Sequence, residues 1–297
     1  MRTTVALTSK RKREPNRDAK STLTPQPTSQ APMAALGSEG AAFGGDPNFM
    51  ASLARGLTVI RAFAQQPHNQ TIAQLSHKTG IPRAAVRRCL YTLNQLGYVA
   101  ANERHFSLAP KILALGHAYL SSTPMVVSAL PFLDQVNAKV HESCSIAVLD
   151  EEEIVYVARS TRTTRIMSID LKPGSRLPAY CSSMGRVLLA HLPPPDLERF
   201  LDKAKLKPLT QRTITSKEKL LQVLEGVREK GYALVDQELE IGLRSIAVPV
   251  RNARGQVVAA MNVGVQAIRV STREMETTAL PHLRAAAVEL GTLLYPS

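Results

Sequence analysis

The 297-residue sequence contains no tryptophan and only three cysteines, and both shortages narrow its class. Aromatic residues make up 4% of the chain, so we expect a core of Leu, Val, Ile and Ala side chains. The cysteines, Cys89, Cys144 and Cys181, are odd in number and show no C-x-x-C spacing. They therefore indicate neither a disulfide framework nor a zinc site, and we interpret them as reduced cytoplasmic thiols.

Long apolar runs are also missing from the sequence. No segment reaches the ~18 consecutive apolar residues that suggest a membrane-spanning helix. The first residues are basic but lack the apolar stretch of a secretory signal. We therefore expect a cytoplasmic location and no membrane partner.

The residue patterns of an enzyme are missing as well. The sequence shows no glycine-rich phosphate loop and no metal-ligand cluster. His141, His191, Cys144 and Cys181 include a possible nucleophile and base, but they stand in no recognisable catalytic spacing. We therefore predict no catalytic residues, no metal and no cofactor, although an enzyme acting on small molecules stays an alternative.

Acidic residues are nearly absent from the segment Asn48–Leu120. It holds eight lysines and arginines but one acid, Glu103, and so carries more than half of the formal net charge of +13. A solvated basic surface is the plain interpretation of such an excess. Concentration of the charge on one small module is, however, the electrostatic pattern typical of a DNA-binding domain.

Hydrophobic periodicity over residues 49–97 predicts three helices. The first places on its inner face Leu53, Leu57, Ile60 and Phe63. A second, short helix follows the capping residue Thr71 and ends at Gly80, and a third runs from Pro82 to Gly97. Two helices joined through a glycine-containing turn match the helix-turn-helix plan.

The third helix carries a basic outer face. Arg83, Arg87 and Tyr91 recur every four residues and therefore project together. The guanidinium fork suits both guanine edges and phosphate, so we assign Arg83 and Arg87 to the major groove. Ala84 or Tyr91 would contact thymine methyl groups. Arg88 either contacts the DNA backbone or packs internally.

The alternating pattern after Gly97 predicts a small hairpin, or wing, that turns at Asn102-Glu103. Arg104 and His105 lie at its tip, where they either contact DNA or are simply exposed. Together with Lys111, they are candidates for phosphate contacts.

Composition divides the chain into four parts. Residues 1–47 form a basic arm that we expect to be disordered, because it lacks apolar periodicity. Its run Lys10–Arg13 either touches DNA phosphates or is a solvated tail. The winged helix-turn-helix domain covers 48–109, a linker helix 110–123, and an effector-binding domain 124–297.

The second domain mixes helices with β-hairpins, which predicts an α+β fold with a largely antiparallel sheet. Hairpin turns are expected at Asp150–Glu153 and Asn252–Gly255. We expect strands over residues 144–149, 154–158, 166–171, 243–250 and 256–265. We expect helices around the stripe Leu130, Leu133, Val136, Val140 and over 181–192, 216–229 and 271–294.

Several sequence blocks resemble the isocitrate-lyase-regulator (IclR) family of bacterial transcription factors. The blocks are Ser52–Leu57, Ile81–Leu90, Leu96–Val99, Met184–Ala190, Lys230–Ala233 and Gly242–Val250, and Glu238 belongs to the same pattern. Two further segments, Arg165–Ser168 and Ser175–Arg186, look like the subgroup that regulates protocatechuate, 4-hydroxybenzoate and β-ketoadipate catabolism. This resemblance implies a winged helix-turn-helix joined to an effector-binding domain with a GAF-like sheet. It also implies homodimers or tetramers, a palindromic double-stranded DNA operator and, for an activator, RNA polymerase as a partner.

The resemblance also implies the position of an effector pocket. By position, the pocket falls on Ile166, Ile169, Ser183, Met184, Asp236, Ser245, Asn262 and Gly264. The apolar members among them either form the pocket wall or belong to the ordinary core. Met184, Ser245, Asn262 and Gly264 differ from the residues of relatives that hold very small keto acids, so a different effector is implied.

We expect the effector to be a small aromatic or dicarboxylic acid. The helix that starts near Ser182 offers backbone N–H groups to a carboxylate, or Ser182 merely caps this helix. Arg165 is a candidate second clamp, and Asn262 a partner for a ring hydroxyl or keto oxygen. A redox-responsive regulator is an alternative, because Cys181 near a helix N-terminus can have a lowered pKa unless it is a buried, inert thiol.

Overall fold

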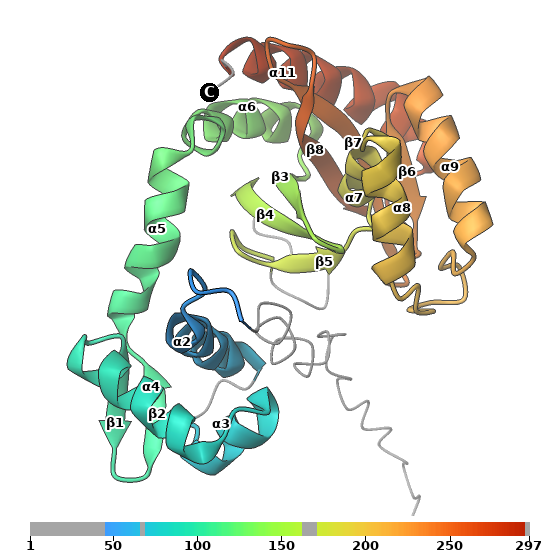
Figure 1. The fold of residues 1–297 in the computed structure, drawn as a ribbon. Coiled ribbons are helices and arrows are strands. Elements are labelled where there is room, and N and C mark those ends of the chain that lie inside the picture. The colour runs from blue at the N-terminus through green and yellow to red at the C-terminus, as the bar shows by residue number, and fades with distance from the viewer. Residues whose placement is uncertain (1–44, 66–68, 162–170, 295–297) are drawn as a thin grey trace, which may run out of the picture. The chain divides into compact units, whose positions relative to one another are not determined.

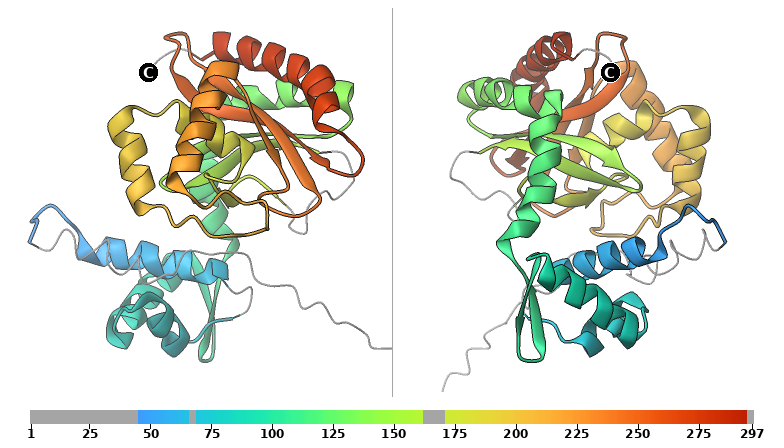
Figure 2. Two further views of the ribbon diagram at one scale, coloured as in Figure 1. Left: turned by 90° about the vertical axis from the view of Figure 1, so that its right-hand side faces the viewer. Right: turned by 60° about the vertical axis from the view of Figure 1, so that its left-hand side comes forward.

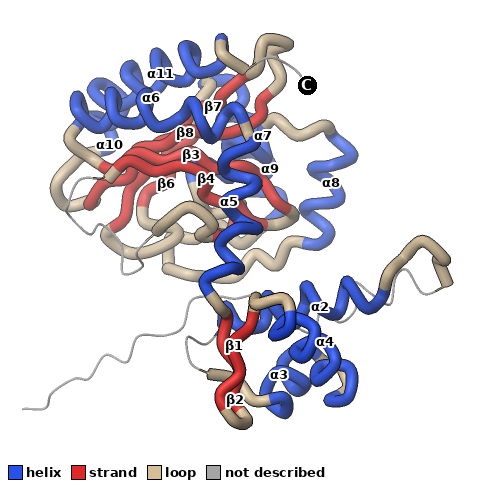
Figure 3. Tube along the Cα trace, turned by 90° about the vertical axis from the view of Figure 1, so that its left-hand side faces the viewer, coloured by secondary structure: helices blue, strands red, loops and turns tan. Residues whose placement is uncertain are grey.

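The computed structural model describes residues 45–65, 69–161 and 171–294, and these form two compact units that divide between Pro110 and Lys111. The first unit contains the helices α2 (Ala51–Ala62), α3 (Ile72–Thr79) and α4 (Arg83–Gln95), followed by the hairpin of β1 (Val99–Asn102) and β2 (His105–Leu108). The hairpin lies beside α3 and α4 (Figure 3). The order confirms the predicted helix-turn-helix with a wing.

Local capping explains the turn between α3 and α4. Thr71 accepts from the backbone N–H of Gln74, whose side chain accepts from the N–H of Thr71 in return. This capping box fixes the start of α3. Gly80, with φ of +69°, ends the helix in the left-handed conformation that favours glycine. Pro82 is the N-cap residue of α4, one position before the predicted first turn.

The predicted inner face of α2 is wrong at two positions. Leu53 and Leu57 are 58% and 50% exposed, whereas Val59, Ala62 and Phe63 enter the core of the unit. The helix carries two apolar stripes, and periodicity alone favoured the one with the larger residues. The helix instead buries the stripe that contains the small side chain of Ala62.

The second unit is built on a six-stranded, wholly antiparallel sheet with the order β5-β4-β3-β8-β7-β6. Its strands are β3 (Ser143–Asp150), β4 (Glu153–Ser160), β5 (Arg176–Pro178), β6 (Ala233–Asp236), β7 (Leu243–Arg251) and β8 (Val257–Gln266). Its helices are α5 (Leu113–Ser122), α6 (Pro124–Val140), α7 (Ser183–Ala190), α8 (Pro194–Lys203), α9 (Lys217–Lys230), α10 (Thr272–Glu274) and α11 (Leu280–Thr292). This arrangement confirms the predicted α+β class.

The two faces of the sheet are covered by different helices (Figures 1 and 2). Helices α6 and α11 pack on one face, where Ile146 and Met261 belong to a continuous apolar core. Helix α7 packs on the opposite face, with Ala147 and Ala260 beneath it and α9 on its outer side. Alternation along each strand assigns neighbouring residues to opposite faces.

Some elements of this unit differ from the prediction. Helix α8 was not expected, because three consecutive prolines suggested a stop; two of them, Pro194 and Pro195, instead occupy the first helical turn. The short edge strands β5 and β6 were also not predicted. Leu130 of α6 is 47% exposed, so it does not belong to the buried stripe. The strand expected at 166–171 falls largely outside the described residues.

No single helix within the described ranges is both long and apolar enough to cross a membrane. The segments Pro110–Ser122 and Pro124–Val140 meet the length and composition test only when they are joined, and a bend of 78° separates them.

Candidate DNA-binding surface and ligand pocket

The outer face of α4 presents a cluster of cations to solvent. Arg83, Arg87 and Arg88 are all exposed, and Tyr91 is 67% exposed. In the described part of the chain, none of these three arginines forms an ion pair with a carboxylate. Ala84 is exposed beside them. The alternative that Arg88 packs internally is wrong.

The wing places two further predicted residues at its tip. Asn102 pairs with His105, so the two residues between them, Glu103 and Arg104, form the loop of the hairpin. Glu103 has a φ of +52°, which marks the sharp reversal of the chain. Arg104 and His105 are exposed, as is Lys111 at the start of the second unit. Because these three side chains are exposed, they can contact a phosphate backbone without any loss of core packing.

In the second unit, a pocket opens on the face of the sheet that carries α7. Its lining combines polar residues with leucines. The polar members are Ser143, Arg159, Ser245, Asn262 and Gly264, and the apolar members are Leu171, Leu177, Leu239 and Leu243. A small molecule with one charged end and an apolar body matches this lining.

Strand register brings the polar residues together from distant parts of the sequence. Ser145 on β3 faces Arg159 on β4 and Asn262 on β8. One step along the strands, Gly264 faces both Ser143 and Ser245. The guanidinium Nη1 of Arg159 donates to Ser145 Oγ at 2.9 Å, which fixes the cation at the pocket.

The carboxamide of Asn262 is a polar group of this pocket whose bonding is incomplete. Its Oδ1 atom is buried and accepts no hydrogen bond from any described residue, while the residue is 7% exposed. A buried polar atom without a partner is costly, so such atoms are usually satisfied by a water or a ligand. Beside it, a Cβ atom on Gly264 would meet no atom within 4 Å, so the pocket keeps space there.

The predicted effector residues do not all lie at this pocket. Ser245, Asn262 and Gly264 line it. Ser183 and Met184 do not line it: each is 1% exposed, and Met184 belongs to the apolar core beneath α7. Three further predicted residues, Arg165, Ile166 and Ile169, lie outside the described residues.

Asp236 and the start of α7 are also occupied by other partners. Asp236 Oδ1 accepts from Arg244 Nε at 2.8 Å, and its second oxygen pairs with Arg212. Ser182 Oγ accepts from the backbone N–H of Gly185 at 3.2 Å, so Ser182 caps its own helix. Neither residue lines the pocket, whereas Arg159 of β4 does.

Arg159 was not among the predicted site residues, and a β-bulge in β4 determines the face to which it points. Ile146 pairs with Ala158 but the next residue, Ala147, pairs with Tyr156, so Val157 is an extra residue in β4. Val157 and Ala158 consequently both join the core under α6 and α11. The extra residue turns Arg159 toward the pocket face. Simple alternation counted from Tyr156 would have placed it on the opposite face.

The thiol chemistry required for a redox switch is absent at Cys181. The residue is 0% exposed, and burial raises the pKa of its thiol from 9.0 to about 12. The lowered pKa on which the redox alternative depended is therefore wrong in direction, because a reactive cysteine needs a stabilised thiolate. Across the described residues, no group of three His, Cys, Asp or Glu side chains is placed to hold a metal ion.

Comparison with known families yields two matches along the chain. Residues 52–103 match the model described as the IclR helix-turn-helix domain. Residues 117–292 match the model described as the C-terminal domain of the bacterial transcriptional regulator IclR.

Individual relatives extend these matches. The chain is 52% identical over 254 residues to the Pca regulon regulatory protein of Pseudomonas putida, covering 86% of this chain and 87% of that protein. It is 39% identical to the p-hydroxybenzoate hydroxylase transcriptional activator of Acinetobacter baylyi, covering 83% and 93%. Among solved structures, an IclR homologue from Microbacterium hydrocarbonoxydans in complex with 4-hydroxybenzoate is 26% identical. That structure has a TM-score of 0.70 and covers 82% of this chain and 98% of its own.

Proposed function

The chain belongs to the IclR family of bacterial transcriptional regulators, and from that premise we propose that it controls aromatic-acid catabolic genes in response to a small carboxylic acid. It is a DNA-binding regulator and not an enzyme, in line with both families and with its relatives. Two relatives are named for the Pca regulon and for p-hydroxybenzoate hydroxylase, and a third binds 4-hydroxybenzoate. These names support an aromatic acid as the effector.

The incompletely bonded Asn262 in a pocket that also contains Arg159 is the observation that carries the proposal. Arg159 pairs with the effector carboxylate, since a guanidinium offers donors in a geometry that fits a carboxylate. Asn262 then bonds a ring hydroxyl, and Ser143 and Ser245 lie one step further along the strands. The four leucines of the lining pack against the ring.

DNA recognition in this proposal uses the exposed face of α4. Arg83 and Arg87 contact base edges, and Arg104, His105 and Lys111 contact phosphates. The protein acts as a homodimer, or a tetramer built from dimers, on a palindromic operator. The exposed apolar side chains Leu53 and Leu57 of α2 support such an assembly, because exposed apolar patches often mark interaction surfaces. An activator would in addition contact RNA polymerase, and its place of action is the cytoplasm.

Titration calorimetry with a panel of acids tests the effector assignment. The panel contains benzoate, 4-hydroxybenzoate, protocatechuate and the dicarboxylate β-ketoadipate. We expect Arg159→Gln to weaken binding of every acid by roughly tenfold or more, because it removes a charge-assisted hydrogen bond. Asn262→Leu, which is close in size, should weaken only the hydroxylated acids by about tenfold relative to benzoate.

The matched control for both variants is Arg199→Gln on α8, an exposed arginine that pairs only with Asp196 in the described residues. Affinities equal to those of the wild type in Arg159→Gln would remove the carboxylate assignment. Tight binding of β-ketoadipate alone would replace the aromatic acid by a dicarboxylic acid as the effector.

A further inference from the structure

One apolar wall of the pocket is held by contacts outside the pocket. Leu239 lines the pocket and lies in the segment Gln237–Gly242, which connects β6 to β7. Gln237 has a φ of +63° and Gly242 a φ of +86°, so the segment turns sharply at both ends. A non-glycine residue in this conformation is strained by about 1 kcal/mol and needs support from its surroundings.

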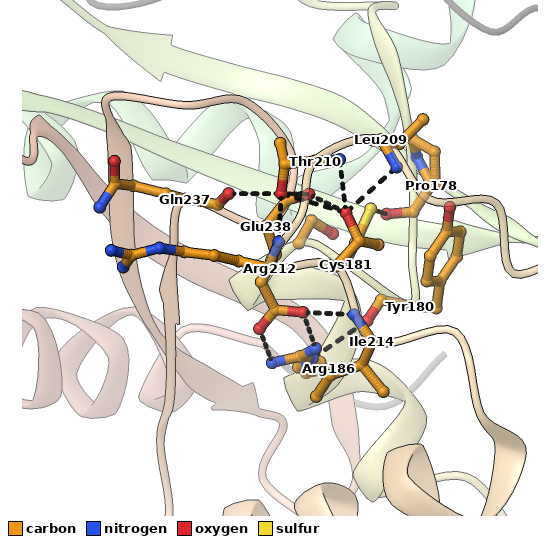
Figure 4. Close-up of polar contacts among 12 residues, drawn as sticks. Pro178, Tyr180, Cys181, Arg186, Leu209, Thr210, Arg212, Ile214, Gln237 and Glu238 are labelled. Atoms are coloured by element: carbon orange, nitrogen blue, oxygen red, sulfur yellow. Dashed lines mark hydrogen bonds and ion pairs between the residues drawn. The ribbon is translucent and has the colours of Figure 1, made fainter.

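The residue before Leu239 supplies that support, through its carboxylate. Glu238 accepts two hydrogen bonds from Arg186 of α7, Nη1 to Oε1 at 2.7 Å and Nη2 to Oε2 at 2.6 Å. A third bond reaches Oε2 from the backbone N–H of Ile214 at 3.1 Å. Figure 4 shows the paired guanidinium and carboxylate, with Ile214 beside them. Arg186 is 2% exposed and Glu238 8% exposed, so the pair is buried.

The backbone of the segment is held as firmly as the side chain. The hydroxyl of Thr213 donates to the carbonyl oxygen of Glu238 at 2.6 Å, and the hydroxyl of Thr210 donates to that of Gln237 at 2.8 Å. Arg186 in turn donates from Nε to the carbonyl oxygen of Tyr180 at 3.0 Å. The anchor therefore joins the pocket wall to α7 and to the turn that precedes α7 (Figure 4).

A gain in folding stability does not explain why Arg186 and Glu238 form a buried ion pair. Burying two charges costs roughly as much free energy as their attraction returns, so a buried ion pair adds little over an apolar pair of equal volume. What the pair does supply is a defined distance between α7 and the segment. Leu239 follows Glu238 in the chain and lines the same pocket as Arg159 and Asn262, so that distance affects where Leu239 lies in the pocket.

We infer that Glu238 is a positioning residue that holds Leu239 over the effector pocket and thereby limits the size of the acid that the pocket accepts. The inference rests on the effector pocket proposed above. Glu238 itself does not line the pocket, so its effect on the effector acts through Leu239.

Two measurements on Glu238→Asp test this role. The variant keeps the charge but shortens the side chain by one methylene. The first is hydrogen exchange on the ligand-free protein, where we expect the amides of residues 239–243 to exchange about tenfold faster while those of α11 stay unchanged. The second is the ratio of the Kd of 2-naphthoate to that of benzoate, which should fall by roughly tenfold as the wall yields to the larger ring.

Two comparison variants separate positioning from general destabilisation. Leu239→Ala removes the wall directly, so it should shift the same ratio by a similar factor, and the double variant should add little. Leu283→Ala lies in the core on the opposite face of the sheet. It should lower Tm without changing the ratio or the exchange of residues 239–243.

Three outcomes would overturn the role of Glu238. The first is unchanged exchange of residues 239–243 in Glu238→Asp. The second is a ratio that shifts in Leu239→Ala but not in Glu238→Asp. The third is a ratio that Leu283→Ala shifts equally. A wild-type protein that binds neither acid would instead contradict the proposed effector, and the exchange measurement would then decide the anchoring alone.

Discussion

The two units of the chain place their functional side chains in opposite environments. On α4, Arg83, Arg87 and Tyr91 stand in solvent within nine consecutive residues. In the second unit, Arg159 and Asn262 are at least partly buried, lie on strands more than a hundred residues apart and meet only through strand register. The DNA-binding surface is thus formed by residues that are close in the sequence, whereas the pocket is formed by residues that only the folded sheet brings together.

Because of this difference, a substitution on α4 should change binding without changing stability, whereas a substitution at the pocket should change both. An exposed arginine on α4 packs against little, so its loss changes binding and leaves the fold intact. A residue of the pocket face shares its neighbours with the core beneath α7, so many changes there affect both. Four predictions examine this contrast.

Gly185→Ala should have the largest effect, and it should fall on the second unit. A Cβ atom at Gly185 would overlap the backbone of Ala179, including its carbonyl oxygen. Backbone cannot move aside as a flexible side chain can, so we expect a loss of about 3 kcal/mol in the free energy of unfolding. Chemical denaturation monitored by circular dichroism measures it.

Gly226→Ala on α9 is the matched control for Gly185→Ala. A Cβ atom there meets nothing within 4 Å. Alanine is the better helix former, so this variant should be stabilised by up to about 1 kcal/mol. Equal stability of the two variants would show that α7 does not lie tightly on Ala179.

Arg87→Ala should have the next largest effect, and it should fall on DNA binding alone. Removing a base contact typically costs ~1–3 kcal/mol of discrimination. We expect operator affinity to fall by roughly 5- to 150-fold at fixed salt while affinity for random duplex falls far less. Because Arg87 is exposed, Tm should stay within the error of the wild-type value. Fluorescence anisotropy with both duplexes measures the difference.

Equal loss of affinity on operator and random DNA would contradict the assignment of Arg87 to a base. It would place the residue on the phosphate backbone instead. A lowered Tm would mean that the exposed face of α4 also supports the fold.

Prediction from sequence worked where the determining signal was local. Thr71, Gly80 and the spacing of Arg83 and Arg87 are each interpretable within one or two helical turns. The face of α2 was the exception within this unit, because its two apolar stripes were both acceptable to periodicity. The choice between them depends on how closely α2 packs in the core, which the sequence of α2 alone does not contain.

Prediction was weaker in the second unit, where non-local contacts decide. Ser245, Asn262 and Gly264, which the resemblance named, line the pocket from regularly paired strands. Arg159 was not predicted, and alternation alone would not have placed it at the pocket, because the bulge in β4 reverses the face to which it points. Asp236 was assigned to the pocket, although Arg212 and Arg244 engage its carboxylate. Arg212 stands 24 residues before Asp236, and a partner at that distance leaves no local pattern.

The buried thiol of Cys181 in the second unit should make the free energy of unfolding depend on pH in the alkaline range. Burial raises the pKa of its thiol to about 12 in the folded protein, while the thiol of the unfolded chain ionises near 9.0. The unfolded state therefore releases this proton first, so the contribution of Cys181 to stability is constant below pH 9 and decreases as the pH rises above it. Each pH unit between the two values costs about 1.4 kcal/mol.

Comparison with Cys181→Ala isolates this contribution, because the other buried groups titrate in both proteins. Urea unfolding at pH 8, 9 and 10 should give a difference between the two proteins that is constant up to pH 9 and then shrinks. A difference that stays constant to pH 10 would mean that the thiol is not buried as described. Rapid alkylation of Cys181 at pH 8 would lead to the same conclusion.

Arg104→Ala should have the smallest effect, and it distinguishes two kinds of contact within the exposed surface. Arg104 lies at the wing tip, where a phosphate contact adds affinity without reading sequence. We expect operator and random duplex to lose the same modest factor, and the slope of log K against log salt to become shallower by about 1. Arg199→Ala, at an exposed arginine of α8, should leave that slope unchanged. A loss of affinity for the operator alone would instead show that Arg104 contacts base edges. Sequence recognition would then involve exposed residues of the β1–β2 hairpin as well as those of α4.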